Sequence, residues 1–367
     1  MSDAENRVEA LEAQYSRYTS RKVLLTAVLF SGIFVMMGVT LMFNGRGVGF
    51  LDSLTYFFGH IAGASYEVGT DGWADDYAIW TVYAPRMIMA IVTGAGLASC
   101  GVVMQALLSN PLADPYTTGL SDGACFGAVA AIVMGFTLSD VSASMGVVTN
   151  AFIGGLIPAV IIILVSRVIV MSGAVAILIG VALSYLFSGM ETLIMVSTDA
   201  DTLKNAYLWQ IGTFTGTTWG ELLIPTAAVA LASAFMILVS RRLNLLSLGD
   251  DSAESLGLDV DNFRTLCMVV VAVSVAAMIS FSGIIGFVGL VIPHIIRMLV
   301  GGDNRYLIPA SMAGGALFLM VADLVSREAI YPDELRVGLI ASVIGSPIFL
   351  YMIVKKKRYG EAYRWST

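Results

Sequence analysis

Long apolar runs, separated by short polar or glycine-rich stretches, dominate the pattern along this chain. A helix that crosses the hydrocarbon core of a bilayer needs about 20 mostly apolar residues. Ten runs approach that length, so we expect an all-α polytopic membrane protein with about ten transmembrane helices and with both termini on one side. The runs lie at about residues 23–43, 87–108, 117–138, 147–166, 174–196, 222–240, 265–282, 284–300, 307–326 and 337–354.

Two boundaries between runs are short, and the number of spans depends on them. The fourth and fifth runs are separated only by the stretch "SRVIVMSG" around Arg167. The seventh and eighth runs are separated only by the glycines of "SGIIGFVG".

The distribution of basic residues gives the orientation, because cytoplasmic loops of membrane proteins are enriched in Lys and Arg. With the N-terminus inside, fifteen of the twenty basic residues fall on the inner side, and four of the five tryptophans fall in or beside outer segments. We therefore expect a multi-pass protein of the cell (inner or cytoplasmic) membrane with both termini cytoplasmic. The basic residues left outside are Arg46, Arg86, Lys204, Arg327 and Arg336.

The polar stretches divide the chain into three parts. Residues 1–22 form a cytoplasmic N-terminal segment, residues 23–354 the transmembrane domain, and residues 355–367 a basic cytoplasmic tail. The first of these lacks the basic start and apolar core of a signal peptide and predicts a short helix on the membrane surface. The longest loop is 241–264 on the inner side and 44–84 on the outer side.

The composition agrees with a membrane protein and excludes several kinds of chemistry. The chain is 57% hydrophobic and 13% charged, with a mean hydropathy of +0.83, whereas a soluble domain carries about 25% charged residues. No lysine follows a glycine-rich turn, so the chain has no P-loop for ATP. The two histidines and three cysteines have no short spacing of the kind that predicts a metal site. We expect no enzyme activity, no metal site, no bound cofactor and no nucleic-acid partner.

Ionisable residues inside apolar runs leave one alternative open. Carriers driven by protons or ions place such groups within the bilayer, where their cost is tolerated only for function. Glu191 in the fifth run and Asp122 at the start of the third are the residues that we single out. A proton- or ion-coupled secondary transporter that uses both carboxylates is therefore the second hypothesis.

Residues 84–127, "APRMIMAIVTGAGLASCGVVMQALLSNPLADPYTTGLSDGACFG", form the most distinctive stretch. Its small residues predict a helix face that a neighbouring helix can approach closely. Pro111 and Pro115 forbid helix on the inner side, and Asn110 and Asp114 are placed to cap the freed backbone groups.

This stretch resembles the iron-chelate and vitamin B12 permease family of ABC importers. The resemblance rests on Pro85-Arg86, Gln105, "NPLADP" at 110–115 and "GLSDGA" at 119–124. Two further blocks occur in the family's order, "GIIGFVGLVIPHIIRMLVGGDNR" with Pro293 and His294, and the last two spans from "ADLVSR" to "DELRVGLIASVIGSPIFLYMI". The likeness covers about residues 80 to 354, with Tyr83 and Arg336 departing from the family's arginine and proline.

The resemblance implies a type II ABC importer permease fold and a permease subunit that transports a bulky metal chelate, such as a ferric siderophore, haem or cobalamin or another corrinoid. It also implies a homodimer with the substrate path between the copies, two ATPase subunits inside that hold ATP-Mg, and a substrate-binding protein outside. On the family's pattern the binding protein would dock on Arg86, Arg327 and Arg336. The path would be lined by Gly180, Ser184, Ser188 and Glu191.

The inner loop 241–264, "RRLNLLSLGDDSAESLGLDVDNFR", is polar in an otherwise apolar chain. Ser247 as N-cap, acidic residues in the first turns and Gly257 as C-cap predict a helix of about ten residues, too short to be stable without a partner surface. By resemblance it is the coupling helix that enters a cleft of the ATPase, with an apolar stripe flanked by acid. The residues concerned are Leu248, Gly249, Asp250, Asp251, Ala253, Glu254, Leu256 and Gly257.

Overall fold

The computed structural model describes residues 3–138, 142–169 and 173–358, and these are nearly all helical. The predicted basic tail, residues 355–367, extends beyond α15 into residues 359–367, which lie outside the described residues. The elements are α1 (Asp3–Met42), α2 (Phe50–Ile61), α3 (Asp71–Tyr77), η1 (Ala78–Tyr83), α4 (Ala84–Leu107), η2 (Pro115–Thr118), α5 (Leu120–Met134), α6 (Ala143–Ser166), α7 (Gly173–Val196), α8 (Ala200–Gln210), η3 (Trp219–Leu222), α9 (Leu223–Leu238), α10 (Ser240–Leu246), α11 (Asp250–Ser255), α12 (Val260–Ser282), α13 (Val288–Val300), α14 (Asn304–Glu328) and α15 (Val337–Arg358).

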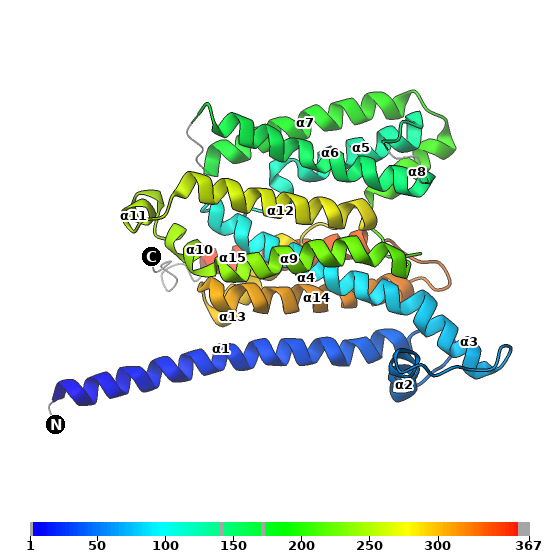
Figure 1. Ribbon diagram of the computed structural model, residues 1–367, viewed down its shortest axis with the longest axis horizontal. Coiled ribbons are helices and arrows are strands. Elements are labelled where there is room, and N and C mark those ends of the chain that lie inside the picture. The colour runs from blue at the N-terminus through cyan, green and yellow to red at the C-terminus, as the bar shows by residue number, and fades with distance from the viewer. Residues whose placement is uncertain (1–2, 139–141, 170–172, 359–367) are drawn as a thin grey trace.

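Ten apolar helices match the ten expected spans in order. Among the described residues, seven helical segments are long and apolar enough to cross a membrane, and α5, α13 and α15 supply three shorter apolar helices. The start of α1 and the short helix α11 lie at one end of the molecule, called the inner end below, and α2 and α3 lie at the opposite, outer end (Figure 1). The seven long segments are Ser16–Met42, Asp71–Leu107, Ser144–Ser166, Gly173–Val196, Trp219–Leu238, Val260–Ser282 and Asn304–Glu328.

The first helix differs from its prediction. The sequence predicts a separate surface helix before the first span, but α1 is one unbroken helix of 40 residues. At about 1.5 Å per residue it is about 60 Å long, roughly twice the thickness of the hydrocarbon core. Its N-terminal part therefore projects past the inner end of the bundle instead of lying across it (Figure 1).

Helix α4 is the centre of the bundle, and small residues let its neighbours approach it closely. It is buried along almost its whole length and packs against α14, α13, α12 and α9. A Cβ atom added at Gly94 would lie 2.2 Å from the carbonyl oxygen of Gly315 in α14, which is far inside van der Waals contact. Because helix association in a bilayer depends on such packing, the predicted small-residue face is confirmed here.

Irregular backbone at the outer side is paired within the protein. Gly212 N–H donates to the Ile284 carbonyl at 2.9 Å, and Gly338 N–H donates to the Gly212 carbonyl at 3.0 Å. Thr213 N–H donates to the Ser282 carbonyl at 2.8 Å. Unpaired backbone groups are costly away from water, so these bonds allow α12 to end and α13 to begin within the bundle. They also fix the segment that carries Thr215 towards α4.

The contact of α4 with α14 gives a stability prediction. The Gly94→Ala variant should lose most of its folded protein, because its new methyl group meets backbone that cannot rotate away. The yield of monodisperse protein in detergent and its melting temperature measure this effect.

The matched control is Gly32→Ala in α1, whose added Cβ would lie 3.4 Å from the flexible side chain of Leu317, also in α14. Its melting temperature should stay close to that of the original chain. Equal behaviour of the two variants would contradict the packing argument.

Candidate functional site

The inner loop folds as two short helices, α10 and α11, instead of the single predicted helix of about ten residues. Gly249 stands at the N-cap of α11 with a φ of 95°, and this left-handed residue separates the two helices. Ser247 is therefore not the N-cap, and its hydroxyl donates back to the Leu243 carbonyl at 3.4 Å. The predicted closing glycine is confirmed, since Gly257 has a φ of 87° and donates its N–H to the Glu254 carbonyl at 2.8 Å.

The apolar residues of this loop do not share one face. Leu248 and Leu256 are 49% and 62% exposed, whereas Ala253 is fully buried. The predicted stripe is therefore wrong for Ala253, because α11 turns this residue towards the transmembrane bundle that supports it. Asp251 and Glu254 are exposed as expected. The leucines and these carboxylates form the surface that a partner can contact.

A cleft of about 430 Å³ opens beside this surface at the inner end. Its walls come from the end of α4 and from α11, so the exposed loop and the centre of the bundle meet there. The lining residues are Leu107, Leu108, Ser109, Gly173, Leu248, Gly249, Asp250, Asp251, Ser252 and Arg264.

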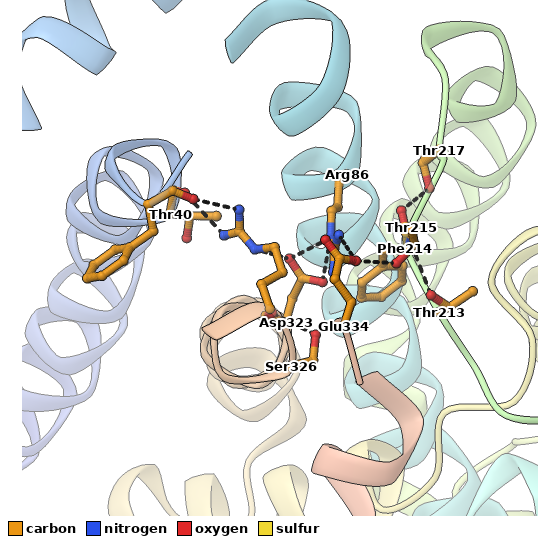
Figure 2. Close-up of polar contacts among 11 residues, drawn as sticks. Thr40, Arg86, Thr213, Phe214, Thr215, Thr217, Asp323, Ser326 and Glu334 are labelled. Carbon is orange, nitrogen blue, oxygen red and sulfur yellow. Dashed lines mark hydrogen bonds and ion pairs between the residues drawn. The ribbon is translucent and has the colours of Figure 1, made fainter. Parts of the chain in front are cut away.

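At the outer end, the two arginines expected to dock a partner are buried. Arg86 is 5% exposed, and its Nε donates to Asp323 Oδ1 at 2.9 Å while its NH1 donates to Glu334 Oε2 at 2.7 Å (Figure 2). Asp323 is fully buried, and a buried carboxylate needs charged partners. This requirement turns Arg86 inwards and engages its Nε and Nη1 with carboxylates of the protein itself.

Arg327 is buried as well. It is 3% exposed, and its guanidinium donates to the carbonyl groups of Phe43 at 3.2 Å and Thr40 at 3.1 Å, at the end of α1. Its Nε lies 3.6 Å from Asp323 Oδ2. Neither arginine is exposed in this conformation, and of the three residues expected to dock the binding protein Arg336 alone is partly exposed.

Glu334 connects this charged cluster to a second loop. Its Oε2 accepts from the Thr215 hydroxyl at 2.8 Å as well as from Arg86 (Figure 2). Partial burial raises the pKa of the Glu334 carboxyl, but the hydrogen bond and the charge of Arg86 outweigh it, so the net pKa is lower than usual. The carboxylate form therefore holds the segment before α9 against α4.

The sequence reasoning missed Asp323 and Glu334. Asp323 lies inside the apolar run 307–326 and four residues before Arg327, a spacing that brings two side chains together on one helix face. That spacing could have identified Asp323 as a third ionisable residue within a span, in addition to Glu191 and Asp122. Nothing in the local sequence points from Glu334 to Arg86, which lies 248 residues away.

The residues predicted to line a path share one side of α7, but most of that side packs against the rest of the bundle. Gly180 and Glu191 are buried, and Glu191 accepts a hydrogen bond from Gln210. Ser184 donates to Asp122 Oδ2 of α5 at 2.6 Å. Of the four, Ser188 lies on the exposed face. The exposed side of α7 is instead lined by large apolar residues, namely Leu178, Val181, Tyr185, Leu186, Met190, Leu193 and Val196.

The turn after α4 follows its predicted capping. Asn110 Oδ1 accepts from Leu112 N–H at 2.9 Å, and Asp114 Oδ1 accepts from Tyr116 N–H at 2.8 Å as the N-cap of η2. Pro111 follows the end of α4, and Pro115 begins η2. The predicted capping of this turn is therefore confirmed.

The remaining motif residues join α4 to α13. Gln105 Oε1 accepts from Arg297 NH2 at 2.9 Å, and its Nε2 donates to the Leu290 carbonyl at 3.4 Å. Pro293 lies inside α13 and is buried, and His294 beside it is half-buried. These side chains give the second sequence block a structural role in the contact between the two helices.

Comparison with known proteins identifies relatives of the whole bundle. The model of the FecCD transport family matches residues 33–355. The hemin transport system permease protein of Yersinia pestis is 36% identical over 286 residues, which cover 76% of this chain and 85% of that protein. The cobalamin import system permease protein of Halobacterium salinarum is 38% identical over 279 residues, 75% of this chain and 73% of that protein.

A solved structure has the same fold. It is described as an inward-facing conformation of a metal-chelate type ABC transporter and is similar to this chain with a TM-score of 0.76 and 32% sequence identity. The match covers 90% of this chain and 99% of that one.

The charged cluster at the outer end predicts a dependence of stability on pH. The lowered pKa of Glu334 means that its carboxylate contributes stability above its ordinary value of about 4.5, and that this contribution is lost as the pH falls through the lower folded value. Melting temperatures in detergent should therefore fall more steeply below about pH 4.5 for the original chain than for Glu334→Gln.

Glu328→Gln, at an exposed position near the end of α14, is the control and should keep the original pH profile. If Glu334→Gln and the original chain show the same acid dependence, the carboxylate of Glu334 does not stabilise the outer end.

Proposed function

The chain belongs to the FecCD transport family, and from this we propose that it is the membrane-spanning permease subunit of an ABC importer for a bulky metal chelate. The observation that carries the proposal is the family match over residues 33–355, which takes in the end of α1 and the apolar helices that follow it. The related hemin and cobalamin permeases support a chelate such as haem, a corrinoid or a ferric siderophore. The permease itself is not an enzyme, and ATP hydrolysis belongs to a separate subunit.

The secondary-transporter hypothesis is set aside. Its two carboxylates serve contacts within the bundle, since Asp122 accepts from Ser184 and Glu191 accepts from Gln210. The relatives are permeases of ABC importers, in which the driving force comes from ATP.

The exposed side of α7 supports a homodimer. This helix crosses the bundle at its edge (Figure 1) and exposes large apolar residues, among them Leu178, which is 69% exposed, and Tyr185, which is 79% exposed. In the proposed dimer this face of each copy lines the substrate path, with Ser188 on it and with Gly180, Ser184 and Glu191 holding α7 to its own bundle.

Two ATPase subunits, each carrying ATP-Mg, would bind at the inner end. Leu248 and Leu256 are largely exposed and therefore contribute little to the stability of the permease alone. Their burial against an ATPase subunit would favour binding, because full burial of a leucine side chain contributes about 1.5–3 kcal/mol. Asp251 and Glu254 beside them would meet basic residues of the ATPase. Both termini of the permease would lie on this cytoplasmic side of the cell membrane.

The substrate-binding protein would dock at the outer end. Of the predicted docking residues, Arg336 keeps partial exposure, while Arg86 and Arg327 would act from within by holding the outer ends of α4, α14 and α1 in place. Charge reversal at Arg86 or Arg327 therefore reports on folding, and docking is better tested at Arg336.

Coupling through α11 gives the first functional prediction. Leu256→Glu should reduce chelate uptake by about tenfold or more in vesicles that contain the reconstituted complex, because a charged side chain replaces an apolar contact with the ATPase. Hydrolysis of ATP measured in the same vesicles should fall less than uptake.

Leu256→Met, which keeps an apolar side chain of similar volume, is the control and should transport normally. Normal uptake by Leu256→Glu would refute the assignment of α11 as the contact with the ATPase.

Identification of the driving force gives the second prediction. With its ATPase and binding protein, the permease should import hemin, cobalamin or a ferric siderophore only when ATP is present on the ATPase side. Uptake that persists without the ATPase and stops when the ion gradient is removed would overturn the proposed function.

A further inference from the structure

Arg264, the last residue of the inner loop 241–264, is a buried arginine to which the expected coupling role of that loop assigns no function. It lies in the first turns of α12 and is 4% exposed. A buried guanidinium is costly unless its donors meet acceptors, so its partners show what the position is built for.

The side chain of Arg264 joins three helices. Its Nε donates to the carbonyl of Leu107 at 3.2 Å, and its NH2 lies 2.9 Å and 3.0 Å from the two carboxylate oxygens of Asp250. Leu107 is the last residue of α4, where helix carbonyls lack partners within the helix. Asp250 is the first residue of α11.

Helix α11 has only six residues and is tied to the bundle at few points. Ala253 packs inwards from its middle, and Asp250 fixes its beginning. A planar guanidinium that contacts a carboxylate and a carbonyl at once is held more rigidly than a single ammonium group. The Arg264 side chain therefore joins α11 to the end of α4, in addition to the short segment 256–259 that connects α11 with α12 along the chain.

The contact also lies where a partner would act. Leu107, Asp250 and Arg264 line the cleft of about 430 Å³, beside the exposed Leu248. The Asp250 side chain is 46% exposed and the Arg264 side chain 5%, so the pair runs from the rim of the cleft into the bundle.

We propose that Arg264 is the positioning residue that transmits the displacement of α11 by the ATPase to the inner ends of α4 and α12. The proposal rests on the proposed function and adds to it the side chain that links the coupling helix to the core. Arg264 acts in this proposal through Asp250 and Leu107, so its role is measured by the number of chelate molecules transported for each ATP hydrolysed.

The test uses the whole complex of permease, ATPase and binding protein in vesicles. Arg264→Gln should lower the ratio of chelate transported to ATP hydrolysed by about tenfold, because an uncharged amide cannot replace a charged contact with Asp250. Arg264→Lys keeps the positive charge but not the planar set of donors. Its ratio of chelate transported to ATP hydrolysed should lie between that of Arg264→Gln and that of the original chain.

A double variant tests the pairing itself. Asp250→Asn should lower the same ratio, and Arg264→Gln combined with Asp250→Asn should be no worse than the stronger single variant, because both changes remove one interaction. Arg241→Gln and Arg242→Gln alter exposed arginines of α10 at the same end and should leave the ratio unchanged.

The outcomes separate this inference from the proposed function. If Leu256→Glu uncouples transport but Arg264→Gln and Arg264→Lys keep the original ratio, the role of Arg264 is overturned and the coupling helix stands. If transport does not depend on the ATPase at all, the proposed function fails first. Should Arg264→Gln not fold, Arg264→Lys and Asp250→Asn decide the question, and an unchanged ratio in both overturns the proposal.

Discussion

The buried carboxylate of Asp323 is the interaction on which the outer half of the bundle depends. It lies between the guanidinium groups of Arg86 and Arg327, in a protein that has few charges within its spans. Removing one partner of such a cluster leaves a buried charge uncompensated, which costs several kcal/mol. The close packing of Gly94 on Gly315 and this cluster therefore act on the same two helices, α4 and α14, and hold them as one unit.

Helix α4 is fixed by an arginine at each end. At the outer end its own Arg86 reaches α14 and the loop before α15, and at the inner end Arg264 of α12 reaches its last carbonyl. The charged groups lie at the ends of the helix and the small residues along its middle, an arrangement that suits a rigid centre in a bilayer. Helices α7 and α11 lie outside this centre, and in the proposed assembly they are the elements that partners contact.

At both ends of the molecule the arginine of a charged pair is buried, and its acidic partner is the more exposed of the two side chains. At the outer end the basic residues are drawn inwards, and Glu334 is the member of the cluster that remains partly open to solvent. At the inner end the basic Arg264 is again the buried partner, and the acidic Asp250 is at the rim. In both places an acidic side chain stands at the surface in front of a buried arginine.

Some features of this protein follow from local sequence alone. Ten apolar runs predict ten helices, because each run must satisfy its backbone within itself in a bilayer. The turn around Asn110 and Asp114 and the C-cap at Gly257 depend only on nearby residues, and these were predicted correctly.

Tertiary structure decided where the arginines and the small residues of the loop point. Arg86 meets Asp323 across 237 residues of sequence, and Arg264 meets Leu107 across 157. The sequence pattern around a basic residue at the edge of a span is the same whether its side chain faces an outer protein or a buried carboxylate. Likewise the periodicity of a six-residue helix cannot tell whether Ala253 faces a partner or its own bundle. The sequence by itself determined the ten apolar helices and their order, and only the packing of distant helices decided which charges are paired and which surfaces are left exposed.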